Sequence, residues 1–215
     1  PREAQSGPLP QAATGIAPGE VRGQAPAPQR PPRAPGGGPR RSRAHAPARA
    51  VNAADIDPVV CRPVGIVRSR FTETSGMPIQ TAGAPDEVGR LEVFAEFAPG
   101  LRDIEGFDYL ILVTHLHRCA HERLEVVPFL DDASHGVFAT RAPARPNRLG
   151  LSIVRLTAVD GTTLHFSGND MVDGTPVLDI KPYVPRFDVR ETERVGWFGA
   201  RLDQLPRTRS DGRMD

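Results

Sequence analysis

Lysine is nearly absent from this chain of 215 residues: Lys181 is the only one, and the other 26 basic side chains are Arg. Cysteine is also scarce. Cys61 and Cys119 form neither a metal-type spacing nor a disulfide framework, so a reducing, cytoplasmic compartment is expected. No apolar run has membrane-spanning length and no signal-peptide pattern is found, since the most apolar stretch, residues 109–113, is as short as a strand.

Large apolar side chains are almost missing from residues 1–50, which hold 11 of the 23 Pro and eight Arg against two Glu. Such a segment cannot bury enough surface to offset its chain entropy, so residues 1–55 are predicted to be a disordered basic tail. Three interpretations of the tail stay open: a transit peptide, an arm that attracts nucleic acid, or an extended reading frame without a role. The remaining 165 residues are mildly acidic, with 19 basic and 24 acidic side chains.

A strand–turn–helix unit with a glycine-rich phosphate loop is also missing, which argues against a nucleotide-binding Rossmann domain. From Cys61 onward, short β-type segments alternate with turn residues. Asp160-Gly161 is a strong hairpin signal, and residues 101–105 are predicted to form one helical turn. The expected strands are residues 64–67, 91–97, 107–117, 123–129, 136–140, 151–158, 163–167 and 177–183.

A C-terminal helix is predicted over residues 190–205, because apolar residues recur there at helical spacing. These are Val195, Phe198, Leu202 and Leu205. Seven or eight short strands with few helices are typical of a closed sheet. The fold class is therefore predicted to be mainly β, a single closed β-barrel with a few short helices and this C-terminal helix. The domain is expected over residues 56–206, followed by a polar tail over 207–215.

Residues 136–152 contain two cations in a proline-stiffened loop. Arg141 and Arg145 are interleaved with Pro143 and Pro146, which restrict where the guanidinium groups point. A rigid loop with two cations suits a carboxylate or phosphate ligand. A solvated turn with incidental Arg stays the alternative.

Carboxylates and the lone Lys gather in residues 167–183. Asp170 lies at the end of an expected strand, where a carboxylate facing a pocket could hold an amine or ribose hydroxyl groups. Asp179, Lys181 and Tyr183 alternate along the next strand and therefore share one face. The alternative for these three is a cross-strand ion pair of little energetic value.

A histidine cluster lies at the end of the longest expected strand. His115 and His117 point the same way on a strand, and Cys119 or His121 could add ligands. A zinc site needs three or four ligands and a supporting shell, and no matching set follows in the sequence. No metal is therefore predicted, and a His that lines a pocket or is satisfied in a turn is the favoured interpretation.

Five segments carry a family resemblance: VGIVRS at 64–69, PIQ at 78–80, FDYLILVTHLH at 107–117, GVFATRAPARPNRLGLS at 136–152 and DMVDGTPVLDIKPYVP at 170–185. In these segments the chain resembles the TsaA-like (YaeB/TrmO) family. The resemblance implies an S-adenosylmethionine-dependent methyltransferase that acts on N6 of threonylcarbamoyladenosine 37 in the anticodon loop of tRNA. It also implies a single β-barrel that binds this cofactor at the interface of a homodimer.

The resemblance further implies which residues form the site. Asp179, Lys181 and Tyr183 would be catalytic and face the methyl-accepting side. The family's usual PRQ triplet is PIQ here, with Ile79 where a cation is expected, and the additional C-terminal region of longer members is not found. The implied cofactor-binding residues are Gln80, Thr81, Ala82, Gly83, His115, Leu116, Arg141, Arg145, Asn147, Leu151, Ser167, Gly168, Asn169 and Asp170.

A mechanism follows from these assignments. An exocyclic nitrogen that accepts a methyl group must lose a proton, and Asp179, Tyr183 or water is the expected acceptor. Lys181 is expected to hold an anionic part of the substrate or to favour the ionised form of Tyr183. Three alternatives stay open: a methyltransferase of the same fold with another substrate, a non-catalytic module that binds S-adenosylmethionine, and a metal enzyme built on the histidine cluster.

Overall fold

The computed structural model describes residues 52–214, and the chain divides into two units, Pro1–Ile56 and Asp57–Asp215. In the first unit one short element is described, the 3-10 helix η1 (Ala53–Asp55). The tail predicted over residues 1–55 falls almost entirely outside the described residues, so it stays a prediction. No helix within residues 52–214 is long and apolar enough to cross a membrane.

The second unit is built mainly from strands. Those described are β1 (Gly65–Arg68), β2 (Val88–Val93), β3 (Tyr109–His115), β4 (Glu125–Val126), β5 (His135–Gly136), β6 (Leu149–Asp160), β7 (Thr163–Ser167) and β8 (Pro176–Pro182). The helical elements are short. They are the 3-10 helices η2 (Thr81–Gly83), η3 (Ala95–Leu101), η4 (Ile104–Gly106), η5 (Val137–Ala139), η6 (Gly196–Ala200) and η7 (Leu202–Gln204), and the α-helix α1 (Pro185–Asp188). A mainly β fold with few helices was predicted and is confirmed.

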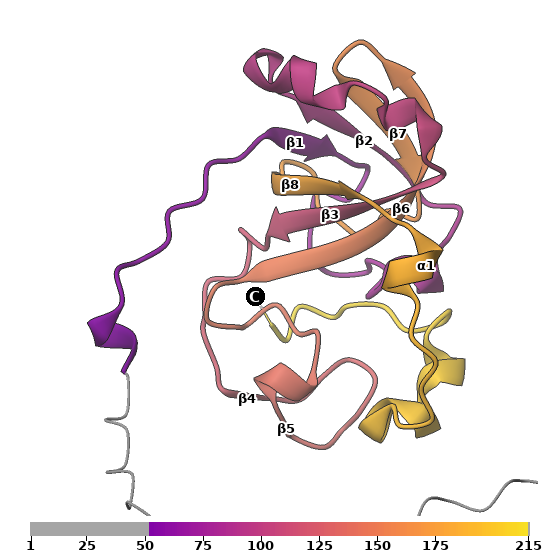
Figure 1. Ribbon diagram of the computed structural model, residues 1–215. Coiled ribbons are helices and arrows are strands. Elements are labelled where there is room, and N and C mark those ends of the chain that lie inside the picture. The colour runs from indigo at the N-terminus through magenta and orange to yellow at the C-terminus, as the bar shows by residue number, and fades with distance from the viewer. Residues whose placement is uncertain (1–51, 215) are drawn as a thin grey trace, which may run out of the picture. The chain divides into compact units, whose positions relative to one another are not determined.

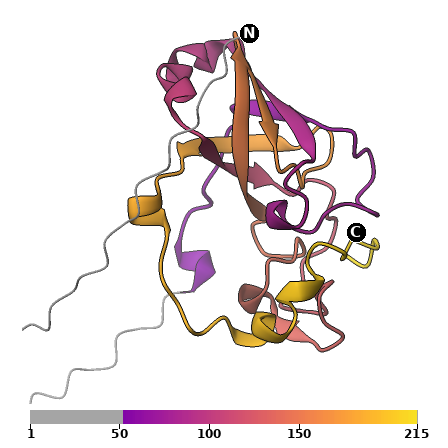
Figure 2. The same cartoon turned by 90° about the vertical axis from the view of Figure 1, so that its right-hand side faces the viewer.

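Six strands pair antiparallel in the order β1-β2-β7-β6-β3-β8, and β8 pairs in turn with β1, so the order closes into a barrel (Figures 1 and 2). The β1–β8 contact is short and joins Gly65 to Val177 and Ile66 to Pro176. The small β4–β5 pair forms a separate sheet beside the barrel. Every barrel strand therefore has a neighbour on each side, although β8 beyond Val177 has no partner residue in β1.

The core fills the barrel because inward residues alternate with outward ones along each strand. On β3, Leu110 and Leu112 point inward and are nearly inaccessible to solvent. The other large core residues include Val67, Leu91, Val154, Leu164, Phe166 and Val177. Side chains from η3 and η4 and the residues around them pack on this core near the start of β3: Phe97, Leu101, Ile104 and Phe107. The other end of β3 is therefore the end that can open to a ligand.

The β6–β7 hairpin was predicted correctly. The strands pair from Arg155 with Ser167 to Asp160 with Thr163, and Gly161 makes the turn at a φ of 59°. A positive φ is the conformation that glycine adopts without steric penalty, which is why Asp-Gly is a hairpin signal.

Several elements differ from expectation. The strand predicted over residues 91–97 is β2 and ends at Val93, and the strand predicted over residues 123–129 is only β4. The helix predicted over residues 190–205 is wrong: the region holds only η6 and η7, and Gly196 interrupts it at a φ of 61°. The apolar residues of this region, Val195, Phe198, Leu202 and Leu205, instead line a cavity. The Trp197 Nε1–H ties the region to a distant loop by donating to the Ala139 carbonyl at 2.9 Å. The strand predicted over residues 136–140 is reduced to the end of β5, followed by η5.

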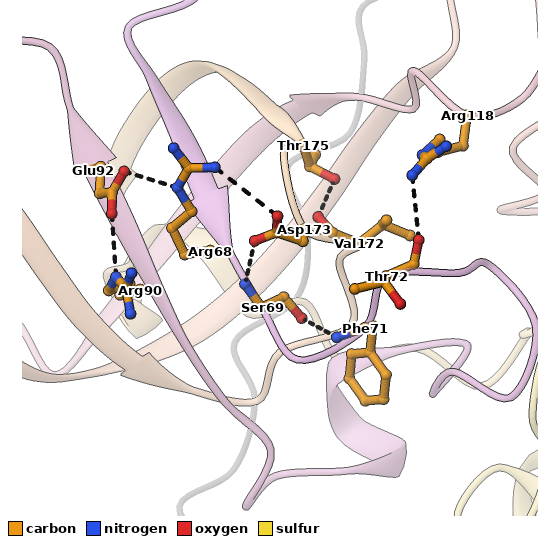
Figure 3. A network of polar contacts seen from close by, with 10 residues as sticks. All are labelled: Arg68, Ser69, Phe71, Thr72, Arg90, Glu92, Arg118, Val172, Asp173 and Thr175. Atoms are coloured by element: carbon orange, nitrogen blue, oxygen red, sulfur yellow. Dashed lines mark hydrogen bonds and ion pairs between the residues drawn. The ribbon is translucent and has the colours of Figure 1, made fainter.

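A polar network fastens the loop after β1 to the loop before β8 (Figure 3). Asp173 accepts from the Ser69 backbone N–H at 3.0 Å and lies 3.9 Å from Arg68, whose Nε donates to Glu92 at 2.8 Å. The fully buried Asn169 donates to the Ser69 hydroxyl at 2.8 Å. Buried polar side chains that are satisfied in this way fix the path of both loops.

Gly65 lies at the β1–β8 contact that closes the barrel and packs tightly against β2. A Cβ at this position would lie 2.5 Å from the Glu92 carbonyl oxygen and 3.0 Å from the Val93 Cα, and backbone atoms cannot rotate away. We expect Gly65→Ala to lower the free energy of unfolding by about 1–3 kcal/mol, as measured by urea unfolding followed through Trp197 fluorescence.

Gly100→Ala is the matched control, because a Cβ there has no atom within 4 Å. Its effect should be below about 1 kcal/mol. Equal stability of the two variants would contradict a role of Gly65 in closure.

Candidate functional site

A cavity of about 920 Å³ opens at the end of the barrel opposite η3 and η4. Its size falls within the range of about 300–1,000 Å³ that is usual for sites of small molecules and cofactors. Its walls come from the loop after β1, the end of β3, the start of β6, the loop before β8 and residues 195–214. Segments far apart in the sequence thus converge on one hollow.

The inward face of the barrel becomes polar where it meets this cavity. Beyond Leu110 and Leu112 the next inward residue of β3 is Thr114, and beyond Val154 the next inward residue of β6 is Ser152. The Ser152 hydroxyl donates to the Asp170 carboxylate at 2.6 Å. A serine, a threonine and a carboxylate therefore form the polar end of a largely apolar cavity.

Asp170 is electrostatically unusual. Burial raises the pKa of its carboxyl group from 3.8 to about 6, because the charged form loses hydration. Hydrogen bonds from Ser152 and from the backbone of Asp170 and Thr81, together with the positive charge of Arg141, oppose this rise. A perturbed carboxylate inside a cavity is a common mark of a binding or catalytic position.

Thr114 provides a second unusual group. Thr114 is 1 % exposed, and its Oγ1 is the only buried side-chain nitrogen or oxygen atom within residues 52–214 that has no hydrogen-bond partner. Gly150 lies opposite it, and a Cβ at Gly150 would lie 2.5 Å from this oxygen. A buried hydroxyl without a partner calls for an explanation, and its place in the cavity wall offers one: a ligand can complete its hydrogen bonding.

The arginine loop forms another wall of the cavity. Arg141 donates to the Gln80 side-chain oxygen at 2.8 Å. Arg145 donates to the Thr140 and Ala142 carbonyl oxygens at 3.1 and 3.3 Å, which ties the loop to itself. Neither guanidinium group forms an ion pair with a carboxylate in the described part of the chain, so both positive charges remain available to an anion.

The structure brings eight of the predicted cofactor residues to the cavity: Gln80, Ala82, Leu116, Arg141, Arg145, Asn147, Leu151 and Asp170. The other six do not line it: Thr81, Gly83, His115, Ser167, Gly168 and Asn169. Asn169 is used within the fold, since it bonds Ser69 and the backbone of Met171. His117 lines the cavity in place of His115, and burial together with the neighbouring charge of Arg118 lowers its pKa.

The three predicted catalytic residues lie on the outside of the barrel and do not line the cavity of their own chain. The Lys181 Nζ lies 2.6 Å from the Asp179 carboxylate, and both side chains are about half exposed, at 61 % and 47 %. The Tyr183 ring meets the edge of Tyr109 with centroids 6.1 Å apart. The predicted shared face is present, although a register shift between Val113 and Thr114 was needed to turn these residues outward.

Several site residues were missed from the sequence. The alternation of β3 could have identified Thr114, since it continues the inward series of Leu110 and Leu112. Ser152 could have been found in the same way from Val154. No sequence pattern predicts that Phe138 and Trp197 line the cavity, because their positions depend on how the loops pack. No group of three or more His, Cys, Asp or Glu among residues 52–214 could hold a metal ion, so the histidine-cluster alternative gains no support.

Comparison with known proteins gives consistent matches. The family model described as tRNA-methyltransferase O N-terminal domain matches residues 66–189. A "Probable S-adenosyl-L-methionine-binding protein" of Pyrococcus abyssi is 51% identical over 157 residues, which is 73% of this chain and 85% of that protein. A Homo sapiens protein named "tRNA (adenine(37)-N6)-methyltransferase" is 34% identical over 137 residues, 60% of this chain and 31% of that protein.

A solved structure is also similar: the crystal structure of TrmO from Pseudomonas aeruginosa, with a TM-score of 0.56 at 37% identity. The match covers 66% of this chain and 63% of the TrmO chain, so this chain spans less than two thirds of that relative.

Ionisation of Asp170 at the polar end of the cavity should make the stability of the fold depend on pH. The pKa of Asp170 is higher in the folded protein than the ordinary 3.8, so the folded state binds the proton more tightly between about pH 4 and 6. Its contribution to stability is therefore largest below about pH 4 and declines as the pH rises to about 6. The native chain should therefore lose stability between pH 4 and pH 7, whereas Asp170→Asn should not. Over this range the free energy of unfolding of the variant should rise by up to about 1–3 kcal/mol relative to that of the native chain.

The measurement is denaturant unfolding of both proteins at the two pH values. Asp211→Asn is the control. The Arg213 hydrogen bond lowers the pKa of Asp211, so this variant should change the pH dependence of stability in the opposite direction. An Asp170→Asn effect that is the same at both pH values would contradict a partly buried carboxylate with a raised pKa.

Proposed function

The chain belongs to the family of the tRNA-methyltransferase O N-terminal domain, and on this premise we propose that it is an S-adenosylmethionine-dependent tRNA methyltransferase. The finer proposal is methylation of N6 of threonylcarbamoyladenosine at tRNA position 37. It is supported by relatives in Mus musculus and Homo sapiens that are named tRNA (adenine(37)-N6)-methyltransferase. The observation that carries the proposal is the large cavity with one polar end, built mostly by residues inside the matched region.

The residues of the cavity fit S-adenosylmethionine. The Asp170 carboxylate suits ribose hydroxyl groups or an ammonium group, and the Thr114 hydroxyl has free hydrogen-bonding capacity. The guanidinium fork of Arg141 suits a carboxylate. Leu116 and Leu151 offer apolar contact to a ring system. When bound, the cofactor supplies a methyl group activated on a positively charged sulfur.

The contribution of the protein to such a transfer is positioning. Apolar walls around the reacting groups exclude water, and the barrel holds the polar end rigidly, so a nucleophile and a methyl group can be kept in line. At neutral pH Asp170, with a pKa of about 6, is mostly ionised and accepts hydrogen bonds. Asn147 and Arg145 hold the opposite wall through the proline-stiffened loop.

A second copy of the chain is needed for the catalytic roles proposed for Asp179, Lys181 and Tyr183. These residues face away from the cavity of their own barrel. The outer faces of β3 and β6 beside them are apolar, with Val113 opposite Leu151 and both Leu149 and Leu151 about half exposed. An exposed apolar sheet face of this kind supports a homodimer. In the dimer we propose, β8 of one chain supplies the proton acceptor and the cation to the cavity of the other.

A cytoplasmic location completes the proposal, supported by Cys61 and Cys119, which are both free thiols. The tRNA substrate would meet Arg141, Arg145 and Arg148 near the cavity. Phosphate contacts by Arg are the usual source of affinity for nucleic acids.

The first test is calorimetry of the full chain with S-adenosylmethionine, followed by a methylation assay on unmodified and threonylcarbamoylated tRNA. We expect binding heat for one site per chain and methyl transfer to the threonylcarbamoylated tRNA. Transfer to another substrate would favour a different acceptor on the same fold. Binding without any methylated RNA would favour a non-catalytic module, and absence of heat would contradict the proposal altogether.

The second test is complementation between two inactive variants. Lys181→Met and Asp170→Asn should each lose most methyl transfer, whereas Lys181→Met should keep its affinity for S-adenosylmethionine. If the two residues serve one site from different chains, mixing the variants after mild dissociation should restore about a quarter of the native activity. Mixtures as inactive as the separate variants, or a chain that is monomeric by light scattering, would overturn the shared site.

A further inference from the structure

Three aromatic side chains gather at one side of the cavity, outside its polar end: Phe138, Trp197 and Phe198. Phe138 is 77 % exposed, although its neighbours Val137 and Thr140 are buried. The short helix η5 therefore anchors through Val137 and leaves the Phe138 ring in the open. A large apolar ring held out at the mouth of a cavity suggests a surface on which a ligand packs.

The surroundings of these rings are rigid. Trp197 stacks on Phe198 with centroids 3.8 Å apart and on His135 with centroids 4.6 Å apart. His135 lies 3.3 Å from the Asp131 carboxylate, which also accepts from Arg201 at 3.0 Å. With the Trp197–Ala139 hydrogen bond, these contacts join residues 131–139 to residues 197–201. A ligand that stacks here would lose little free energy to ordering of the protein.

Most of the charged residues that line the cavity are cations. Among the described residues that line the cavity, the cations Arg118, Arg141 and Arg145 face a single carboxylate, Asp170, which lies at the polar end. Arg118 and Arg141 are exposed, and within residues 52–214 their side chains donate to a backbone carbonyl and to an amide oxygen. Aromatic rings beside unpaired Arg groups are the combination that holds a single-stranded nucleic acid, the rings through stacking on bases and the Arg groups through phosphates.

We propose that Phe138, whose neighbour Ala139 is held by the hydrogen bond from Trp197, is a stacking surface on which an unpaired base of the RNA substrate rests beside the cavity. This inference rests on the proposed function and adds to it a recognition element on the chain's own surface. An apolar protein partner would not account for the three Arg groups, whereas a nucleic acid uses both the rings and the charges.

The test compares four variants of the full chain: Phe138→Ala, Phe138→Leu, Phe138→Tyr and the control Phe187→Ala. Phe187 is also exposed, at 59 %, but does not line the cavity. The probes are a synthetic anticodon stem–loop and a fully paired RNA duplex, with affinity measured by fluorescence anisotropy. Calorimetry with S-adenosylmethionine and light scattering report the cofactor site and the oligomeric state.

We expect Phe138→Ala and Phe138→Leu to weaken binding of the stem–loop about tenfold, because stacking on the base is lost. Phe138→Tyr and Phe187→Ala should bind it as the native chain does. Duplex affinity should stay unchanged in all four, since its bases are already stacked. Heats with S-adenosylmethionine and the molecular mass should also be native in all four.

Several results would overturn the inference. Native stem–loop affinity in Phe138→Ala would exclude a contact, and native affinity in Phe138→Leu would show an apolar contact without stacking. Loss of cofactor heat in Phe138→Ala would assign the ring to the cofactor, and a changed mass would assign it to a subunit contact. Failure of the proposed function is distinguishable, because it would show in the native chain as absence of cofactor heat or of methyl transfer.

Discussion

Closure of the barrel through the short β1–β8 contact is the constraint on which the rest of the structure depends. Only Gly65 and Ile66 pair with β8, and Gly65 also pairs with Val93 of β2 at a distance that leaves no room for a side chain. The closed ring sets the direction of every strand end. The loop after β1, the loop before β8 and the connection from β3 to β6 leave the same end of that ring, and residues 195–214 complete the cavity after leaving β8 at the other end.

The polar groups at the end of the cavity are unfavourable for the free energy of folding, and the packed core of the barrel has to compensate for them. Asp170 is held where burial disfavours its charge, and the Thr114 hydroxyl is held without a partner. Natural proteins retain such unfavourable groups mainly at functional sites, because a ligand later supplies the missing interactions. The same logic applies to Phe138, whose exposure is unfavourable in the free chain and useful only against a partner.

Much of the fold could be predicted from local signals. The β6–β7 hairpin follows from Asp160-Gly161, and the long apolar run around β3 follows from its composition. The helix expected over residues 190–205 failed, because Val195, Phe198 and Leu202 have helical spacing but Gly196 adopts a positive φ and Trp197 bonds a distant loop. Apolar spacing reports that side chains are buried somewhere, and it does not report which element buries them.

The sequence alone determined most of the barrel strands, the main turn and the two proline-stiffened Arg residues, since these depend on neighbours within a few positions. Only the tertiary structure decided which polar groups meet. Ser152 joins Asp170 across 18 residues of chain, and Trp197 joins Ala139 across 58. A register shift at Val113 also turned Asp179 and Lys181 outward, away from the cavity of their own chain. Pairing between distant strands fixes such contacts, and no local pattern encodes the register of that pairing.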